Sequence, residues 1–235
     1  LRLPGHVPAV YYPGTVWKGE LNMERIICLA MGYVFGLFQT GYFYGKLHSI
    51  DLHQYGSGNV GTTNALRVLG WKAGLIVFLG DFLKTVIPCM LVRFVLFQDH
   101  PEMTYVLMLY TALGVILGHN YPFYMGFRGG KGIAATAGLI FSLDWRVTLI
   151  CLVIFVGTVA VTRFVSLGSI LVVLALAACA VYFGGHGYFG LGEKHLAEFY
   201  SLAAAIALLA IWRHRANIGR LLHGTENKLG EKKKS

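Results

Sequence analysis

Charged residues are scarce in this sequence. Asp, Glu, Lys and Arg make up 13% of its 235 residues, and only 11 residues are acidic. A soluble domain has about 25% charged residues, whereas this chain has a mean hydropathy of +0.60. No polar stretch is long enough to build a separate soluble domain. Composition therefore predicts an integral membrane protein.

Several kinds of site are also missing. The four cysteines lie in apolar stretches without CxxC or metal-ligand spacing, which predicts buried free thiols. No acidic cluster is present, so we predict no metal and no cofactor. The first 22 residues lack the basic-then-apolar order of a secretory signal. Residues 1–22 are interpreted as a disordered or non-native extension before Met23, residues 23–230 as the membrane domain, and 231–235 as a basic tail.

The net charge of +9 is the main charge signal. Beside apolar spans, it indicates anionic lipid or an anionic substrate rather than nucleic acid. Membrane lipid is therefore an expected partner, and nucleic acid is not.

Seven stretches are candidate spans, which predicts an all-α polytopic helical bundle. A crossing helix needs about 20 apolar residues, and the fourth stretch is the shortest and weakest. Without the fourth stretch the count of spans is six, and without the charged second stretch as well it is five. The candidates are residues 26–45, 74–97, 105–118, 132–143, 147–162, 167–184 and 197–212.

Lys and Arg are concentrated in the tail and in the loops after the first, third and fifth spans. By the positive-inside rule, these segments are cytoplasmic and the N-terminus is outside. The inference depends on the tail, because the loops alone are balanced.

The first polar motif is "GSGNVGTTNALRVLG", residues 56–70. Its composition indicates a poor helix and a poor span. Glycines permit positive φ and let backbone N–H groups converge, and Arg67 offers a fork that grips phosphate. A flexible turn is the alternative, although a turn needs fewer glycines. Small polar side chains add hydrogen-bonding groups: Ser57, Asn59, Thr62, Thr63 and Asn64.

The second motif, "HNYPFYMGFRGGKGIAATAG", precedes a predicted helix. Loop amides, a helix N-terminus and the cations Arg128 and Lys131 predict an anion-binding site. It is not a Walker A loop, because Met125 replaces the first glycine and Gly132 replaces Ser/Thr. A positive-inside anchor is the alternative, but it leaves the glycines at 129, 130 and 132 unexplained.

The third motif is "WRHRANIGRLLHGTENKLG", residues 212–230. On a helix, His214 and Asn217 share a face, while Arg213 and Arg220 lie elsewhere on its surface. A basic juxtamembrane helix on anionic lipid is the alternative.

Two further features fall in or beside the spans. Asp81 and Lys84 can pair at i, i+3 inside the second span, either for function or as a self-compensating structural pair. In "TRFVSLGSI", Arg163, Ser166 and Ser169 lie at the cytoplasmic level. One of the two serines is expected to cap the next helix, and Ser166 is also a candidate substrate-binding residue.

The motifs "SGNVGTTNALRVLG", "GFRGGKGIA", "RFVSLGSI" and "HRANIGRLLHGTENK" resemble those of the bacterial acyl-phosphate:glycerol-3-phosphate acyltransferases. The resemblance covers residues 23 to about 230. It implies a multi-pass enzyme of the bacterial cytoplasmic membrane with its active site facing the cytoplasm. The implied reaction moves a fatty acyl group from acyl phosphate to the 1-hydroxyl of sn-glycerol 3-phosphate, giving lysophosphatidate and phosphate. It also implies a functional pairing with an enzyme that makes acyl phosphate.

The resemblance implies roles for individual residues. Ser57 and Arg67 would be essential in the first motif, His214 and Asn217 in the third, and Glu226 would maintain integrity. The second motif would hold the phosphate of glycerol 3-phosphate, with Arg128 standing where many members have Lys. Candidate substrate-binding residues are Asn59, Thr63, Asn64, Arg128, Gly129, Gly130, Lys131, Gly132 and Ser166.

The mechanism expected from the residues is direct transfer, because Ser57 has no adjacent His–Asp relay in the sequence. Either His214 or a substrate phosphate takes the proton. An organic-anion transporter and a non-catalytic lipid-binding scaffold are the competing interpretations. A transporter needs a midplane site, whereas the three motifs are predicted to meet at the cytoplasmic face.

Overall fold

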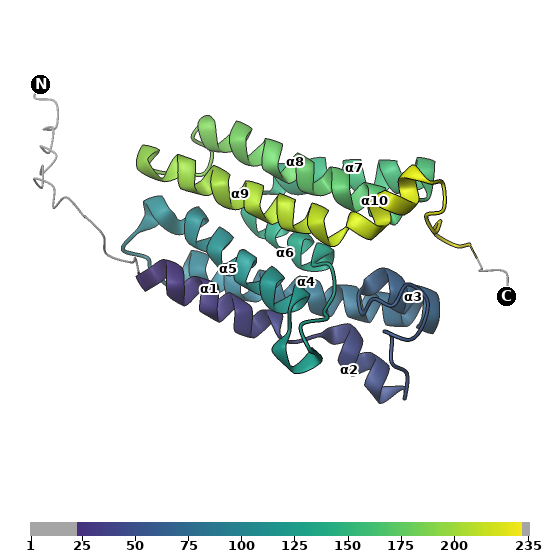
Figure 1. Ribbon diagram of the computed structural model, residues 1–235. Helices are drawn as coiled ribbons and strands as arrows, with labels where there is room; N and C mark the ends of the chain where they lie inside the picture. Colours follow the sequence, from purple (N-terminus) through teal and green to yellow (C-terminus); the bar gives the residue numbers. More distant parts are fainter. Residues whose placement is uncertain (1–22, 232–235) are drawn as a thin grey trace, which may run out of the picture.

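The structure, a computed structural model, describes residues 23–231 and consists of helices and loops over that range (Figure 1). The predicted extension over residues 1–22, and residues 232–235 of the predicted basic tail, lie outside the described residues. The long helices are α1 Met23–Gly36, α4 Trp71–Phe94, α5 Thr104–Asn120, α7 Trp145–Thr162, α8 Val165–Gly185 and α9 Glu193–Arg213. The short ones are α2 Thr40–Leu47, α3 Thr62–Leu69, α6 Ile133–Leu143 and α10 Arg215–Leu222, with 3₁₀ turns at Pro101–Met103 and Phe123–Met125.

The described residues contain six helical stretches long and apolar enough to cross a membrane, rather than the seven predicted. The predicted fourth span is α6, whose 11 residues extend only about 16 Å. Its end nevertheless lies beside the end of α4, because Arg93 donates a hydrogen bond of 2.9 Å to the Ser142 carbonyl. The C-terminal end of α6 therefore lies at the same end of the bundle as that of α4, and the alternation of loops stays a prediction.

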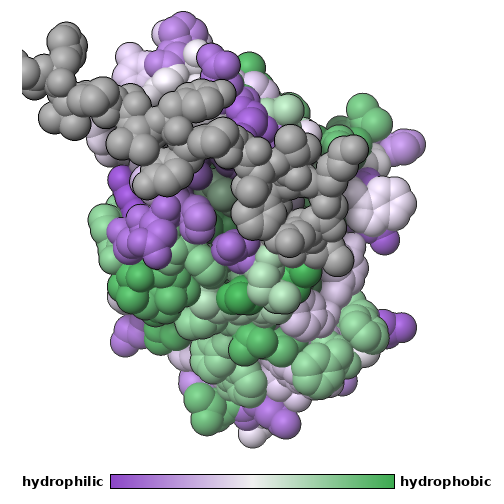
Figure 2. Space-filling model, turned by 90° about the vertical axis from the view of Figure 1, so that its left-hand side faces the viewer, coloured by the Kyte–Doolittle hydropathy of each residue, from purple (hydrophilic) through white to green (hydrophobic). Residues whose placement is uncertain are grey.

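The loops predicted to be cytoplasmic gather at one end of the bundle, together with α2, α3 and α10 (Figure 1). There the His53 ring lies 2.9 Å from the Arg128 carbonyl, and Arg163 donates to the Leu229 carbonyl at 2.7 Å. We call this the site end. The opposite end carries the ion pair of Arg25 with Glu198, and its hydrophilic side chains lie in patches beside hydrophobic ones (Figure 2). Which end is cytoplasmic stays a prediction.

Glycines bring α1 and α5 into close contact. Gly32 and Gly36 on α1 face Gly114 and Gly118 on α5, and a Cβ at Gly32 would lie 2.0 Å from the Thr111 carbonyl oxygen. Each pair has GxxxG spacing, which lets helices approach without intervening side chains in a membrane. Backbone packing therefore joins these two helices.

The first predicted span is broken after Gly36 instead of running on as one helix. The Gln39 side chain donates to the carbonyls of Gly36 at 3.1 Å and His119 at 3.0 Å, and Lys84 donates to that of Phe38 at 2.7 Å. Carbonyl groups at a helix break inside an apolar bundle need such partners, because water cannot reach them. The sequence pattern of apolar residues did not reveal this break.

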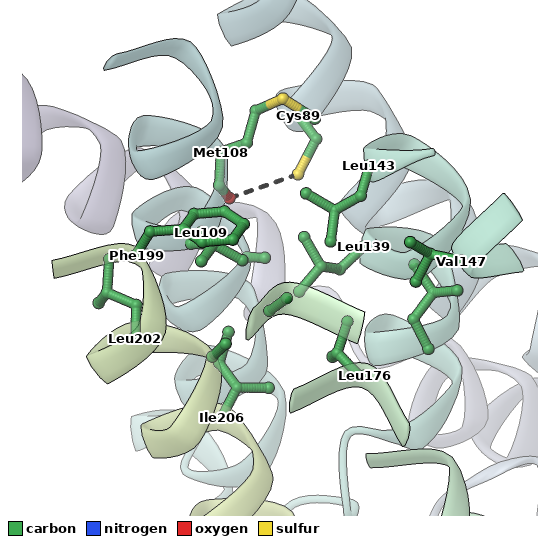
Figure 3. Packing of buried hydrophobic residues seen from close by; sticks show 14 of the residues in the cluster. Cys89, Met108, Leu109, Leu139, Leu143, Val147, Leu176, Phe199, Leu202 and Ile206 are labelled. Atoms are coloured by element: carbon green, nitrogen blue, oxygen red, sulfur yellow. Dashed lines mark hydrogen bonds between the residues drawn. The ribbon is translucent and has the colours of Figure 1, made fainter. Parts of the chain in front are cut away.

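Most buried apolar side chains form one core between α4, α5, α6, α8 and α9 (Figure 3). Leu139, Leu176, Phe199 and Ile206 are completely buried there, and Cys89 lies 3.8 Å from the Met108 carbonyl. All four cysteines are buried and free, which confirms the prediction. The core borders the cavity, because its members Ile140, Cys151 and Val172 also line the cavity.

The glycine-rich stretch at 56–70 is only partly irregular. Its second half forms α3, so the prediction of a poor helix is wrong for that part. The helix buries Ala65 in a small cluster with Leu52, Val60 and Val77. Packing of this apolar face supplies the stability that the local sequence lacks.

Gly114→Ala should lower the thermal unfolding midpoint of the protein in detergent. Its Cβ would lie 2.1 Å from the Leu29 carbonyl oxygen, and overpacking of this kind costs roughly 1–3 kcal/mol or more. Gly157→Ala on α7 is the matched control, because its Cβ meets nothing within 4 Å and alanine favours a helix by about 1 kcal/mol. Equal effects of the two substitutions would contradict the packing of α1 on α5.

Candidate functional site

A cavity of about 490 Å³ at the site end receives residues from all three motifs. Segments that are far apart in the sequence therefore supply one pocket. Most of the residues singled out in the sequence line it: Ser57, Asn59, Thr63, Asn64, Arg67, Lys131, Gly132, Ser166, His214, Asn217 and Glu226.

Three predicted site residues do not line the cavity: Arg128, Gly129 and Gly130. Arg128 is exposed. The amides of Gly129 and Gly130 donate to carbonyls at the end of α5, and Arg213 donates to both glycine carbonyls, at 3.0 and 2.6 Å. These two amides are occupied, so the predicted anion site cannot use them. Arg213 likewise holds this loop instead of lying free on the surface.

The N-termini of three helices face the cavity instead. Its lining includes residues 61–63 at the start of α3, 132–134 at the start of α6 and 165–166 at the start of α8. Free N–H groups and the helix dipole favour negative charge at such ends. The hydroxyls of Thr62 and Ser166 are buried and have no partner within residues 23–231, so both are available to an anion.

The expected capping of α8 by a serine is wrong. Phe164 is the N-cap residue and makes no side-chain bond. Ser169 donates to the Val165 carbonyl within the helix at 2.8 Å, and Ser166 faces the cavity. Both hydroxyls lie one turn or less from the helix start, but neither satisfies its first amides.

A polar chain links the second and third motifs. Lys131 donates to Asn217 Oδ1, Asn217 Nδ2 donates to Glu226 at 2.8 Å, and Arg220 donates to the other Glu226 oxygen at 2.8 Å. Because lysine only donates and carboxylate only accepts, these partners fix the orientation of the Asn217 amide. Glu226 thus holds α10 and its following loop in place, and Arg220 faces the cavity, contrary to expectation.

Positive charge is concentrated around Lys131. Burial, together with the nearby cations Arg220, Arg213 and Arg67 and against the opposing effect of Glu226, lowers the pKa of the Lys131 ammonium to about 8. Such crowding is unfavourable without an anion between the cations, since like charges repel. An anionic ligand would relieve it.

His214 is buried at the junction of α9 and α10. Its Nδ1 lies 2.7 Å from the Ala210 carbonyl, which can only accept, so Nδ1 carries the proton and Nε2 is left as an acceptor. Burial, then the charge of Lys131, lowers the pKa of the imidazole to about 4. His214 is therefore neutral at pH 7 and can accept one hydrogen bond in the cavity.

Asparagines shape the first motif. Asn64 accepts from the Ser57 amide at 2.8 Å and donates to the carbonyls of Leu52 and Tyr55. Asn59 accepts from the Gly61 amide at 2.9 Å. These contacts fold the loop, so Asn64 has little capacity left for a ligand. The exposed Ser57 hydroxyl has no hydrogen-bond partner among residues 23–231, and no imidazole is within hydrogen-bonding distance of it.

Beyond its polar part, the cavity continues as an apolar slot between α4 and α7. Phe78 and Phe82 come from α4, Leu152 and Val156 from α7, and Ala137 of the short α6 lies at the back. Ile133, Ile140 and Phe141 of α6 line the same cavity, so α6 contributes to its apolar wall. We call this the apolar slot.

The sequence did not identify several lining residues. His119 begins the second motif, but it was not singled out, and Asp81 was noted only as half of an ion pair. Periodicity offers no signal for either, because their contacts come from other helices. The polar lining residues to which the sequence assigned no site role are Asp81, His119, Thr148, Ser169, Arg220 and Asn227. No group of three or more potential metal ligands occurs in the described part of the chain.

A family model described as glycerol-3-phosphate acyltransferase matches residues 26–224. Proteins named glycerol-3-phosphate acyltransferase from Shouchella clausii (strain KSM-K16) and Halalkalibacterium halodurans are 38% and 40% identical, over 89% and 91% of this chain and 98% and 100% of theirs. A crystal structure of PlsY (YgiH), an integral membrane glycerol 3-phosphate acyltransferase, in its glycerol 3-phosphate form is 34% identical. It has a TM-score of 0.74 and covers 88% of this chain and 96% of its own.

A second structure of that protein, in its lysophosphatidic acid form, has a TM-score of 0.72 and 33% identity. The family model covers the first two motifs and the third as far as residue 224, together with the helices that carry them. This chain is therefore a multi-pass integral membrane protein of the glycerol-3-phosphate acyltransferase family.

Proposed function

We propose that the protein transfers a fatty acyl group from acyl phosphate to the 1-hydroxyl of sn-glycerol 3-phosphate. The products are lysophosphatidate and inorganic phosphate. The observation that carries the proposal is one cavity in which a cationic, hydrogen-bonding pocket continues into an apolar slot. A phosphate-bearing acceptor fits the pocket, and an acyl chain fits the slot. The relatives named glycerol-3-phosphate acyltransferase, and the lysophosphatidic acid form of a structural neighbour, support acyl transfer to glycerol 3-phosphate.

In this proposal two phosphoryl groups are held by the helix N-termini and by Arg67, Lys131 and Arg220. Fixed amides and cations stabilise charge on the transferring group better than water does, because they need no reorganisation. The slot aligns the acyl carbonyl with the glycerol hydroxyl, and alignment is most of what an already activated donor requires. Asn217 and Glu226 keep Lys131 in place.

The transfer is direct. The 1-hydroxyl oxygen bonds to the acyl carbon, the bond from that carbon to the phosphate oxygen breaks, and phosphate leaves with its electron pair. A substrate phosphate takes the hydroxyl proton, because a phosphate with a second pKa of about 6 is a stronger base than His214, whose pKa lies at about 4. His214 orients the hydroxyl through Nε2.

The proposed setting is a bacterial cytoplasmic membrane with the site end toward the cytoplasm, supplied by a separate enzyme that makes acyl phosphate. A transporter of organic anions is not favoured. The cationic groups of the cavity lie at the site end, and the cavity continues from them as an apolar slot instead of a polar path to the opposite end.

Purified protein should release phosphate from acyl phosphate only when glycerol 3-phosphate is added. Lys131→Ala and Arg67→Ala should each raise the KM for a phosphate-bearing substrate by roughly 10- to 100-fold, the value of a lost hydrogen bond to a charged group. Arg128→Ala is the matched control, because Arg128 is exposed and outside the cavity. Phosphate release independent of glycerol 3-phosphate would contradict the proposal.

The kcat/KM for glycerol 3-phosphate should fall as the pH rises through about 8, where free Lys131 loses its proton. The charged form exists below this pKa, so binding of the anion is retained at lower pH and lost at higher pH. In Lys131→Arg the alkaline limb should disappear, since guanidinium keeps its charge. An unchanged alkaline limb in that variant would assign it to another group.

Acid quenching during turnover with labelled acyl phosphate should trap no acyl-enzyme. The Ser57 hydroxyl has no base to activate it in the described structure. Label bound to Ser57, absent from Ser57→Ala, would show a covalent pathway instead of direct transfer.

A further inference from the structure

Three ionisable side chains meet inside the bundle beside the cavity. Lys84 Nζ lies 2.9 Å from Asp81 Oδ1 and 2.8 Å from His119 Nδ1, and all three residues are at least 95% buried. Thr40 donates to the same Asp81 oxygen at 3.1 Å. Intramembrane charges are costly unless paired, and they commonly mark functional positions. The acyl-transfer steps described above use none of the three.

This cluster joins separate segments of the chain. Lys84 and Asp81 belong to α4, His119 ends α5, and Lys84 also donates to the carbonyl of Phe38 in the break after α1. Because an ammonium only donates, His119 Nδ1 accepts from it, and the ring is held in one orientation. Lys84 therefore fixes the His119 ring relative to two other helices.

The fixed ring lies directly against the loop that carries Lys131. A Cβ on Gly130 would lie 2.0 Å from His119 Nε2, so no side chain fits between them. Gly130 donates its amide to the His119 carbonyl at 3.1 Å, and Arg213 holds the Gly130 carbonyl at 2.6 Å. The backbone just before Lys131 is thus held between His119 and Arg213.

We propose that Asp81, Lys84 and His119 form a buried positioning unit that sets the place of Lys131 through Gly130. None of the three needs to touch the reacting atoms. Their effect reaches the substrate because the Lys131 ammonium has a single productive position between Asn217 and the bound phosphate. Gly130 is a glycine because of the imidazole against it, and its amide is not offered to the ligand.

The contact allows a size-exchange test. Gly130→Ala should displace the His119 ring and raise the KM for glycerol 3-phosphate by roughly tenfold, with a smaller effect on kcat. His119→Asn removes the atoms that clash but keeps an acceptor for Lys84. In the double variant the KM should return to within about threefold of that of His119→Asn alone. The KM for acyl phosphate should change little throughout.

Gly129→Ala is the matched control. Its Cβ would lie 2.0 Å from the backbone oxygen of His119 instead of from the ring. Shortening the His119 side chain cannot relieve that clash, so His119→Asn should not restore the KM of Gly129→Ala. If the glycine substitutions acted only by destabilising the fold, His119→Asn would affect Gly129→Ala and Gly130→Ala in the same way.

Each outcome decides the question. A raised KM that persists in His119→Asn/Gly130→Ala, or equal rescue of Gly129→Ala, overturns the positioning unit. If Gly130→Ala fails to fold, folding of the double variant supports the proposal and failure of both contradicts it.

The inference rests on the proposed function, because its readout is the KM for glycerol 3-phosphate. An inactive wild-type protein would contradict that function, whereas active wild type without rescue contradicts only the inference.

Discussion

Helix ends that lie inside an apolar bundle must find partners for their backbone groups, and the organisation of the site follows from this constraint. Unpaired N–H and C=O groups cost several kcal/mol where water is excluded. The carbonyl ends of α1 and α5 are satisfied by Gln39 and Lys84. The amide ends of α3, α6 and α8 face the cavity, where an anion can bind them. The carbonyl ends of α1 and α5 are therefore hydrogen-bonded within the protein, whereas the amide ends of α3, α6 and α8 are available to a ligand.

The shortness of α6 connects the polar pocket with the apolar slot. The helix has 11 residues and begins at Ile133. Its N-terminus therefore lies next to Lys131. Its side chains line the cavity together with those of α4 and α7. The same short helix thus provides the positive end of a dipole and part of the apolar slot that is proposed to hold the acyl chain. A helix long enough to span the membrane at this position would extend into the polar pocket.

The cations in the pocket repel one another, and the surrounding residues hold them in place against this repulsion. Burial and neighbouring cations lower the pKa of Lys131, and Asn217 and Glu226 hold its ammonium in position. Arg213 donates hydrogen bonds to glycine carbonyls, so its guanidinium group shapes the loop and is not free to bind an anion. An anion bound in the pocket would therefore restore electrostatic balance, which is what the proposed reaction between two phosphorylated substrates requires.

Composition and motif order already indicated the class of protein and the all-helical bundle, and most of the residues singled out in the sequence line the cavity, because hydropathy, glycine spacing and cation position are local properties. Tertiary structure alone decided the break after Gly36, the length of α6 and the use of Gly129 and Gly130. The break depends on contacts of Gln39 and Lys84 with distant segments, and the use of the two glycines depends on their contact with His119. Local sequence states which groups are available to donate and accept, but only packing decides which partner each of them reaches.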